Sequence, residues 1–142
     1  MPGIVGLGEA CRLRQLEMAK DEKAISLLRD KLQNLLQEKI SNLVVNGDLN
    51  SRLAGNLHIS IPGIPNSAII ARIRDRLSIS TGSACSSGVV ASSHVLRAMN
   101  LPIELIEGSL RIGLGKFTTN QEIEMSANII SDVVSKINIL MN

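Results

Sequence analysis

Aromatic residues are almost absent from this sequence. Phe117 is the one Phe among 142 residues, and there is no Trp or Tyr. Proteins that bind single-stranded nucleic acid stack the bases on aromatic side chains, and this sequence offers no such platform. A net charge of +2 likewise gives no strongly basic surface for a phosphate backbone. We therefore expect no nucleic-acid partner.

Long apolar runs are also missing. No hydrophobic segment approaches the roughly 20 residues that cross a bilayer, so we expect no membrane insertion. The N-terminus does not resemble a secretory signal, which favours a reduced, cytoplasmic setting for Cys11 and Cys85 over a disulfide. Cys11 lies in a Leu-rich helical pattern, which predicts a small core residue.

Clustered metal ligands are a third absence. His58 and His94 are the only histidines, and neither belongs to a ligand cluster. A zinc site needs about four suitable ligands, or three and a water, so we expect no metal site. His58 is interpreted as a sheet-face residue. His94 is interpreted as a helix residue that tunes Cys85 if the loop between them folds back.

The remaining composition, with 44% hydrophobic residues, predicts one folded domain over residues 1–142. A long helical segment spans 4–40, as one helix or as two with a break near Asp21, where Asp would cap the second helix. A sheet-containing core over 42–115 and a C-terminal helix over 119–140 follow. This order predicts an α+β two-layer sandwich, in which helices cover a small antiparallel or mixed sheet.

Two strands alternate clearly between apolar and polar residues. In 56–61, the alternation predicts a buried face, with His58 and Ser60 facing away from it. In 109–114, it predicts that Arg111 points away from the core, toward the face that a cofactor or partner would occupy. The residues predicted to face the core are Leu57, Ile59, Ile61, Leu110, Ile112 and Leu114.

Shorter signals place the other elements. A strand over 43–46 ends in an Asn-Gly-Asp turn, and helices are predicted over 66–76, from Ser92 or Ser93 to Met99, and over 102–107. The arginines of the 66–76 helix are expected to be solvated. Thr119 and Glu122 have the spacing of a capping box that begins the last helix. Gly6 and Gly8 indicate close packing of the first helix against another surface.

Cys85 lies in the segment Ser-Ile-Ser-Thr-Gly-Ser-Ala-Cys-Ser-Ser, residues 78–87. The pattern predicts a short strand that leads into an exposed loop of small residues. The thiolate is the reactive form of cysteine, and an unobstructed thiol can reach both a donor and an acceptor of sulfur. The alternative is a buried structural cysteine, which the Ser and Gly neighbours disfavour.

Arg111 lies within the segment Ser-Leu-Arg-Ile-Gly-Leu-Gly-Lys-Phe-Thr-Thr, residues 109–119. A guanidinium fixed in a strand can bind a carboxylate through two parallel hydrogen bonds. The alternative is a structural ion pair or a surface arginine. Lys116 is interpreted as a solvated lysine.

The sequence resembles the C-terminal part of the cysteine desulfurases of the NifS and IscS group. The resemblance lies in these two segments and in Asn46-Gly47-Asp48 and Val95-Leu96-Arg97-Ala98-Met99. This group belongs to the class V aminotransferases, which depend on pyridoxal phosphate. The resemblance implies the small C-terminal domain of a fold-type I enzyme. It also implies that Cys85 takes sulfur from L-cysteine as a persulfide, leaving L-alanine, and that Arg111 holds the substrate carboxylate.

The large domain of that family, with its Schiff-base lysine and most phosphate contacts, has no counterpart in this sequence. We therefore expect no cofactor-binding residue here and no binding of pyridoxal phosphate by this chain alone. One hypothesis is a desulfurase domain that is inactive in isolation and acts with a large-domain chain. The other is a non-catalytic truncated domain that accepts persulfide or serves in protein interaction and dimerisation.

The resemblance also implies partners. A homodimer, or a complex with the missing large-domain chain, is expected. The long loop around Cys85 resembles that of the NifS and IscS branch, which implies sulfur delivery to an iron-sulfur scaffold or a sulfur-carrier protein for iron-sulfur cluster assembly.

Overall fold

The protein is described here in a computed structural model, in which residues 1–81 and 93–141 are placed. Helices and strands follow one another as α1 (Pro2–Lys39), β1 (Val44–Val45), β2 (Asn56–Ser60), α2 (Asn66–Ile73), α3 (His94–Ala98), α4 (Ile103–Glu107), β3 (Ser109–Gly113) and α5 (Asn120–Met141). The predicted α+β class is confirmed.

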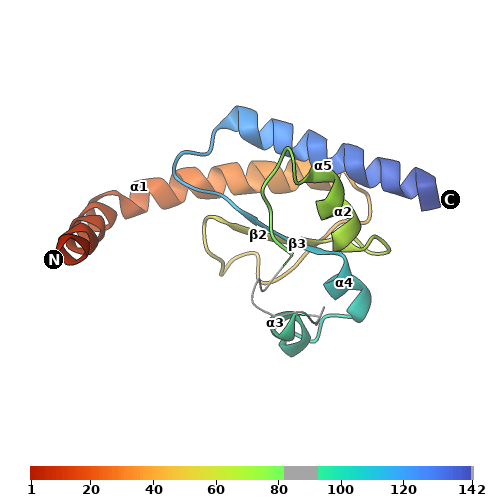
Figure 1. Ribbon diagram of the computed structural model, residues 1–142, viewed down its shortest axis with the longest axis horizontal. Helices are drawn as coiled ribbons and strands as arrows, with labels where there is room; N and C mark the ends of the chain where they lie inside the picture. Colours follow the sequence, from red (N-terminus) through yellow and green to blue (C-terminus); the bar gives the residue numbers. More distant parts are fainter. Residues whose placement is uncertain (82–92, 142) are drawn as a thin grey trace.

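The sheet has three antiparallel strands in the order β1-β2-β3. One face carries the apolar residues that alternation predicted, and it packs against α1, α2 and α5. In Figure 1, α1 and α5 lie side by side on that face, whereas α3 and α4 lie on the opposite side of the sheet. The sheet therefore has a helix-covered apolar face and a second face that carries the polar side chains of β2 and β3.

The core is built from aliphatic side chains alone. Leu32 and Leu36 of α1 are almost fully buried against the sheet and α5. From α5 the buried set is Ile123, Ala127, Ile130, Val133, Val134 and Ile137. This three- and four-residue spacing presents one apolar stripe to the sheet, as the sequence predicted. Phe117, the one aromatic residue, is 87% exposed and takes no part in the core.

The predicted break near Asp21 is wrong, because α1 is one helix from Pro2 to Lys39. Asp21 does not act as a cap. Its carboxylate instead lies 3.9 Å from Arg14 of the same helix and 3.7 Å from Lys116, which follows β3. These ion pairs compensate within the helix for the weak helical preference of Asp.

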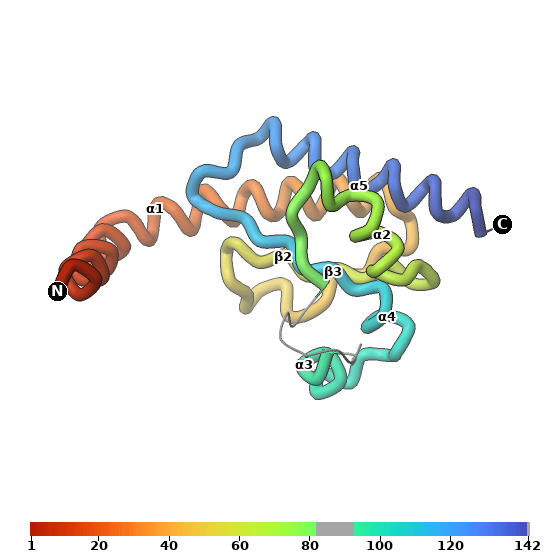
Figure 2. The backbone as a smooth tube through the Cα atoms, in the orientation of Figure 1, coloured from red at the N-terminus to blue at the C-terminus, as the bar shows by residue number. Residues whose placement is uncertain are grey.

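The N-terminal half of α1 differs from two further expectations. Its residues 2–16 are exposed, and the helix extends past the beginning of α5 as a curved arm (Figure 2). Nothing lies within 4 Å of a Cβ placed on Gly6 or Gly8, so the expected close packing is wrong for the described residues. Cys11 is exposed rather than a core residue, because its part of the helix has no neighbour to bury it.

Ser60 is a further correction. It faces away from the apolar core as predicted, yet it is fully buried, because α4 covers this end of the second face. Its hydroxyl donates a hydrogen bond of 2.6 Å to the carbonyl oxygen of Leu105 in α4. The second face of the sheet is therefore covered at the end beside α4, while Asn56, His58 and Arg111 line a cavity farther along it.

The predicted helix starts are largely confirmed. The backbone N–H and the hydroxyl of Thr119 donate to the Glu122 carboxylate, and Glu122 N–H donates back to the Thr119 hydroxyl, which forms the capping box of α5. Ser93 caps α3 by accepting from Leu96 N–H. Asn66 begins α2 but donates to the Ser109 carbonyl oxygen instead of capping the helix, and α2 ends at Ile73, not at residue 76.

Replacing Ile130 with alanine should destabilise the protein by about 2–5 kcal/mol, because Ile130 is fully buried and its loss leaves a cavity in the core. Ile139→Ala is the matched control in the same helix, since Ile139 is 72% exposed, and it should change stability by less than about 0.5 kcal/mol. Urea denaturation followed by far-ultraviolet circular dichroism measures both. Equal losses would contradict the assignment of the buried face of α5.

Candidate functional site

Arg111 is held in place by the alternation of β3. Leu110 and Ile112 on either side of it are buried in the core, so the Arg111 side chain must leave from the opposite face of the sheet. Its backbone is fixed on its other edge by Ser80, with hydrogen bonds of 2.7 Å and 3.0 Å in both directions. A guanidinium nitrogen of Arg111 also lies 3.4 Å from the Ser80 hydroxyl. The base of this side chain is therefore rigidly positioned.

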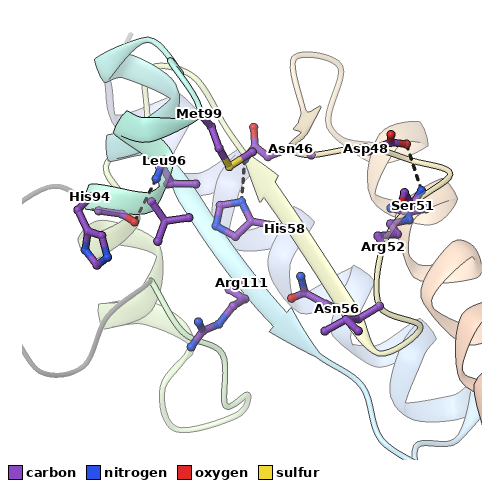
Figure 3. Close-up of a pocket in the computed structure, with 14 residues that line it drawn as sticks. Asn46, Asp48, Ser51, Arg52, Asn56, His58, His94, Leu96, Met99 and Arg111 are labelled. Carbon is purple, nitrogen blue, oxygen red and sulfur yellow. Dashed lines mark hydrogen bonds between the residues drawn. The ribbon is translucent and has the colours of Figure 1, made fainter.

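His58 lies directly opposite Arg111 in the antiparallel register of β2 and β3. Residues paired in this way project from the same face of the sheet. Figure 3 shows both side chains on that face, which is also the face toward α3. The sequence reading treated His58 only as a sheet-face residue, and the structure brings it into the same site as Arg111.

A cavity of about 500 Å³ opens over this pair. Its floor is the polar face of β2 and β3, one wall is α3, and the other wall is the loop between β1 and β2. The lining residues are Asn46, Gly47, Asp48, Ser51, Arg52, Leu53, Asn56, His58, Ser93, His94, Val95, Leu96, Met99 and Arg111. The volume is in the range of small-molecule sites, which is about 300–1,000 Å³.

The loop that forms one wall has its own local order. Gly47 takes a φ of +91°, a conformation that favours glycine, so the predicted Asn-Gly-Asp turn is confirmed. The Asp48 carboxylate then accepts the backbone N–H groups of Asn50 at 2.7 Å and Ser51 at 3.1 Å. These two hydrogen bonds lower the pKa of Asp48 below its ordinary value.

The same loop is fastened to α1 by two arginines. Arg29, only 7% exposed, donates from one guanidinium nitrogen to the carbonyl oxygens of Leu53 at 3.1 Å and Ala54 at 3.3 Å. Arg52 reaches back to the Asp30 carboxylate at 3.1 Å. These bonds hold the outer wall of the cavity against the helix, and Arg52 shares the Asp30 carboxylate with Arg29.

A chain of part-buried hydrogen bonds leads to His58. The Ser60 hydroxyl donates its one hydrogen to the Leu105 carbonyl oxygen, and it accepts from the Asn46 amide nitrogen at 2.7 Å. The same nitrogen lies 2.9 Å from His58 Nδ1, while the buried Asn46 amide oxygen has no hydrogen-bond partner among the described residues. With the amide nitrogen on this side, Nδ1 is the acceptor and a neutral His58 ring carries its hydrogen on Nε2.

The electrostatics agree with a neutral imidazole. Burial of the ring, and secondly the positive charge of Arg111, lowers the pKa of His58 below its ordinary value of 6.5. Arg111 itself has no carboxylate partner among the described residues. Arg111 is therefore a cation without a carboxylate partner in the described part of the chain, and it lies on the same cavity as a neutral imidazole, an arrangement suited to a small carboxylate.

Cys85, the predicted nucleophile, lies outside the described residues. His94 lines the same cavity as Arg111 and His58, and its predicted effect on Cys85 stays a prediction.

No metal cluster of three or more His, Cys, Asp or Glu side chains occurs within residues 1–81 and 93–141. In the same part of the chain, no helix combines the length and apolar character that a membrane span requires.

The residues present do not fit pyridoxal phosphate. A Schiff base needs a lysine over the cofactor, and none of the lysines in the sequence lines the cavity around Arg111. Lys116 borders a separate hollow of about 640 Å³ between α1 and the start of β2. There it pairs with Glu17 and Asp21 while its side chain stays 43% exposed, so the expected solvated lysine also forms ion pairs.

Comparison with known proteins places this arrangement in a family. The class V aminotransferase family matches residues 1–125. The chain belongs to this family. It is 41% identical over 136 residues to the cysteine desulfurase IscS of Rickettsia africae (strain ESF-5) and to that of Ehrlichia chaffeensis. Each match covers 96% of this chain and 33% of the relative, so the chain spans about a third of the length of these relatives.

Solved structures give the same result for the fold. A NifS-like protein superimposes with a TM-score of 0.81 at 26% identity, over 94% of this chain and 33% of that protein. A second, the NifS-like protein from Rickettsia africae ESF-5, has a TM-score of 0.79 at 24% identity and supports the fold alone. The predicted relationship to the NifS and IscS group is confirmed.

His58 and Asn46 are the site residues that sequence reasoning missed. The sequence indicated part of this site, because His58 and Arg111 each occupy a position of an alternating strand that points away from the core. What the sequence did not contain was the register that sets the two residues opposite each other. The contact of Asn46 with His58 depends on that fold as well.

The lowered pKa of His58 predicts a pH dependence of stability. The unfolded chain binds a proton at His58 near pH 6.5, whereas the folded chain binds it only at lower pH. Stability should therefore be complete above pH 6.5 and fall as the pH drops below that value. His58→Gln, which keeps an acceptor for Asn46 but does not titrate, should flatten the fall in melting temperature between pH 7.5 and 5.5. The same slope in both proteins would contradict the neutral, buried state of His58.

Proposed function

We propose that this chain supplies the substrate-carboxylate anchor and the sulfur acceptor of a cysteine desulfurase. Arg111 binds the carboxylate of L-cysteine in the cavity between the sheet and α3. Cys85 accepts the sulfur atom as a persulfide, and L-alanine is the other product. The observation that carries this proposal is the cationic Arg111, which faces a cavity without a carboxylate partner among the described residues.

The geometry supports the anchoring role of Arg111. An arginine with a structural role is normally paired, as Arg29 and Arg52 are through carbonyl oxygens and Asp30. Within residues 1–81 and 93–141, the neutral hydroxyl of Ser80 is the one hydrogen-bond partner of the Arg111 side chain. Such a guanidinium retains donors for both oxygens of a carboxylate. A cavity of about 500 Å³ leaves room beside the carboxylate for the rest of a larger ligand.

Pyridoxal phosphate, which supplies the chemistry that labilises the substrate in this family, is not held by this chain in the proposal. The lysine and the phosphate contacts come from the large domain, on the same polypeptide or on a second one. The chain alone is then inactive. With the cofactor in place, Cys85 passes its sulfur to an iron-sulfur scaffold or a carrier protein in the cytoplasm.

A second candidate function is a non-catalytic module for persulfide acceptance or dimerisation. The observation that favours it is the apolar surface of the N-terminal half of α1, where several large side chains are exposed. These are Ile4, Val5, Leu7, Leu13, Leu16 and Met18. A surface of this kind is suited to covering by a large domain or a second copy.

The proposal is tested by restoring the missing portion. The part of the Rickettsia africae cysteine desulfurase that precedes the matching third is fused to this chain, and sulfide release from L-cysteine is measured with added pyridoxal phosphate. Arg111→Ala should lower kcat/KM by about 100-fold, because it removes a two-point, charge-assisted carboxylate contact. Cys85→Ser should abolish the persulfide detected by mass spectrometry of the peptide.

Arg76→Ala is the matched control, because Arg76 is an exposed arginine that follows α2 and does not line the cavity. It should leave kcat/KM within about twofold of the parent fusion. An active fusion in which Arg111→Ala and Arg76→Ala behave alike would overturn the anchoring role. An active fusion that needs Arg111 but forms no persulfide would overturn the role of Cys85.

The isolated 142-residue chain should release no sulfide from L-cysteine with added pyridoxal phosphate. The physical reason is that none of its lysines lines the cavity beside Arg111. Borohydride reduction, which makes a lysine Schiff base permanent, followed by mass spectrometry checks cofactor binding independently of turnover. A reduced lysine adduct together with sulfide release would show that one of these lysines serves the cofactor after all.

A further inference from the structure

We propose that His58 is a second recognition residue of this site, which donates its Nε2–H to the carboxylate that Arg111 binds. This inference rests on the proposed function, because it assigns a role within the same carboxylate site. It adds a neutral donor from β2 to the cationic anchor from β3. The ligand class is the monoanionic α-carboxylate of a small amino acid.

The first support is position. His58 and Arg111 are directly opposed across β2 and β3, and the Cβ atoms of such a pair lie about 4.5–5.5 Å apart. Both side chains line the one cavity (Figure 3). The longer Arg111 side chain carries its guanidinium past the strand, while the shorter His58 ring stays close to the sheet. Potential donors from two neighbouring strands therefore line the same cavity.

The second support is the hydrogen-bond state of the ring. Nδ1 is occupied by the Asn46 amide, whose orientation is set by Ser60 and Leu105. In this arrangement Nε2 carries the hydrogen, and no hydrogen bond joins it to another of the described residues. A half-buried donor without a partner is costly unless water or a ligand accepts from it. The orientation of the ring is thus fixed before any ligand arrives.

The third support is charge. A second cation beside Arg111 would repel it, whereas a neutral donor adds a hydrogen bond without that cost. Three other ionisable residues line the cavity in the described part of the chain. Arg52 shares the Asp30 carboxylate with Arg29, the Asp48 carboxylate accepts from two backbone N–H groups, and His94 lies on α3. A cationic Arg111 without a carboxylate partner and a neutral donor beside it match the two oxygens of a carboxylate.

The test is ¹⁵N NMR of the histidine rings of the 142-residue chain, titrated with L-alanine as a carboxylate probe that lacks a thiol. The sequence has two histidines, so a spectrum of His94→Gln assigns both rings. Without probe, His58 should show a protonated Nε2 and an unprotonated Nδ1. With probe, the Nε2 resonance of His58 should shift along a saturation curve that gives the Kd.

Two variants then distinguish the loss of the His58 hydrogen-bond donor from a loss of folding. His58→Phe removes the donor and should raise the Kd for L-alanine about tenfold, the cost of one hydrogen bond to a charged group. His58→Gln, which retains an acceptor for Asn46 and an N–H donor, should restore the Kd to within about threefold. These Kd values are measured from backbone amide shifts, and melting temperatures report whether each variant is folded.

The outcomes distinguish this inference from the proposed function. Binding that Arg111→Ala abolishes, while the His58 Nε2 resonance and the Kd of His58→Phe stay unchanged, would overturn the role of His58 and leave the anchor intact. L-alanine binding that is absent, or that Arg111→Ala does not weaken, would overturn the anchor and with it the role of His58. Loss in His58→Phe with recovery in His58→Gln supports the inference even if His58→Phe is the less stable variant.

Discussion

The antiparallel pairing of β2 with β3 determines both faces of the sheet at once. With Leu57 opposite Ile112 and Ile59 opposite Leu110, the apolar side chains meet α1 and α5 and form the core. The same register leaves His58 opposite Arg111 on the other face. A slip of one residue would expose the core face and bury a guanidinium, so the hydrophobic core also enforces the geometry of the candidate site.

Polar groups connect this sheet to the walls of the cavity. On the side of α4, the Leu105 carbonyl, Ser60 and Asn46 form a buried chain that ends at the His58 ring. On the side of α1, Arg29 and Asp30 hold the loop between β1 and β2. Removing one member of a buried chain leaves the next without a partner, which is why such networks fix side-chain orientation strongly. The cavity is therefore shaped by elements on both sides of the sheet.

Much of this fold is predictable from the sequence, because local patterns determine it. Alternation gave the apolar face of β2 and β3 and the outward direction of Arg111, and the spacing of Thr119 and Glu122 gave the start of α5. The burial of Ser60 was not predictable, since it depends on where α4 packs. The pairing of His58 with Arg111 depends on a register between strands about 50 residues apart. Family resemblance supplied the proposed role of Arg111 but said nothing of His58.

The two halves of α1 have unequal tertiary support. Leu32 and Leu36 are locked between the sheet and α5, whereas the residues before Glu17 are exposed on all sides. An isolated helical segment of this length is only marginally stable in water. Backbone amides of the arm would consequently exchange their hydrogens through local fraying, while those near Leu32 would exchange only when the whole core opens. The contacts of Lys116 with Glu17 and Asp21 lie at the boundary between the part of α1 that exchanges by fraying and the part that exchanges by opening of the core.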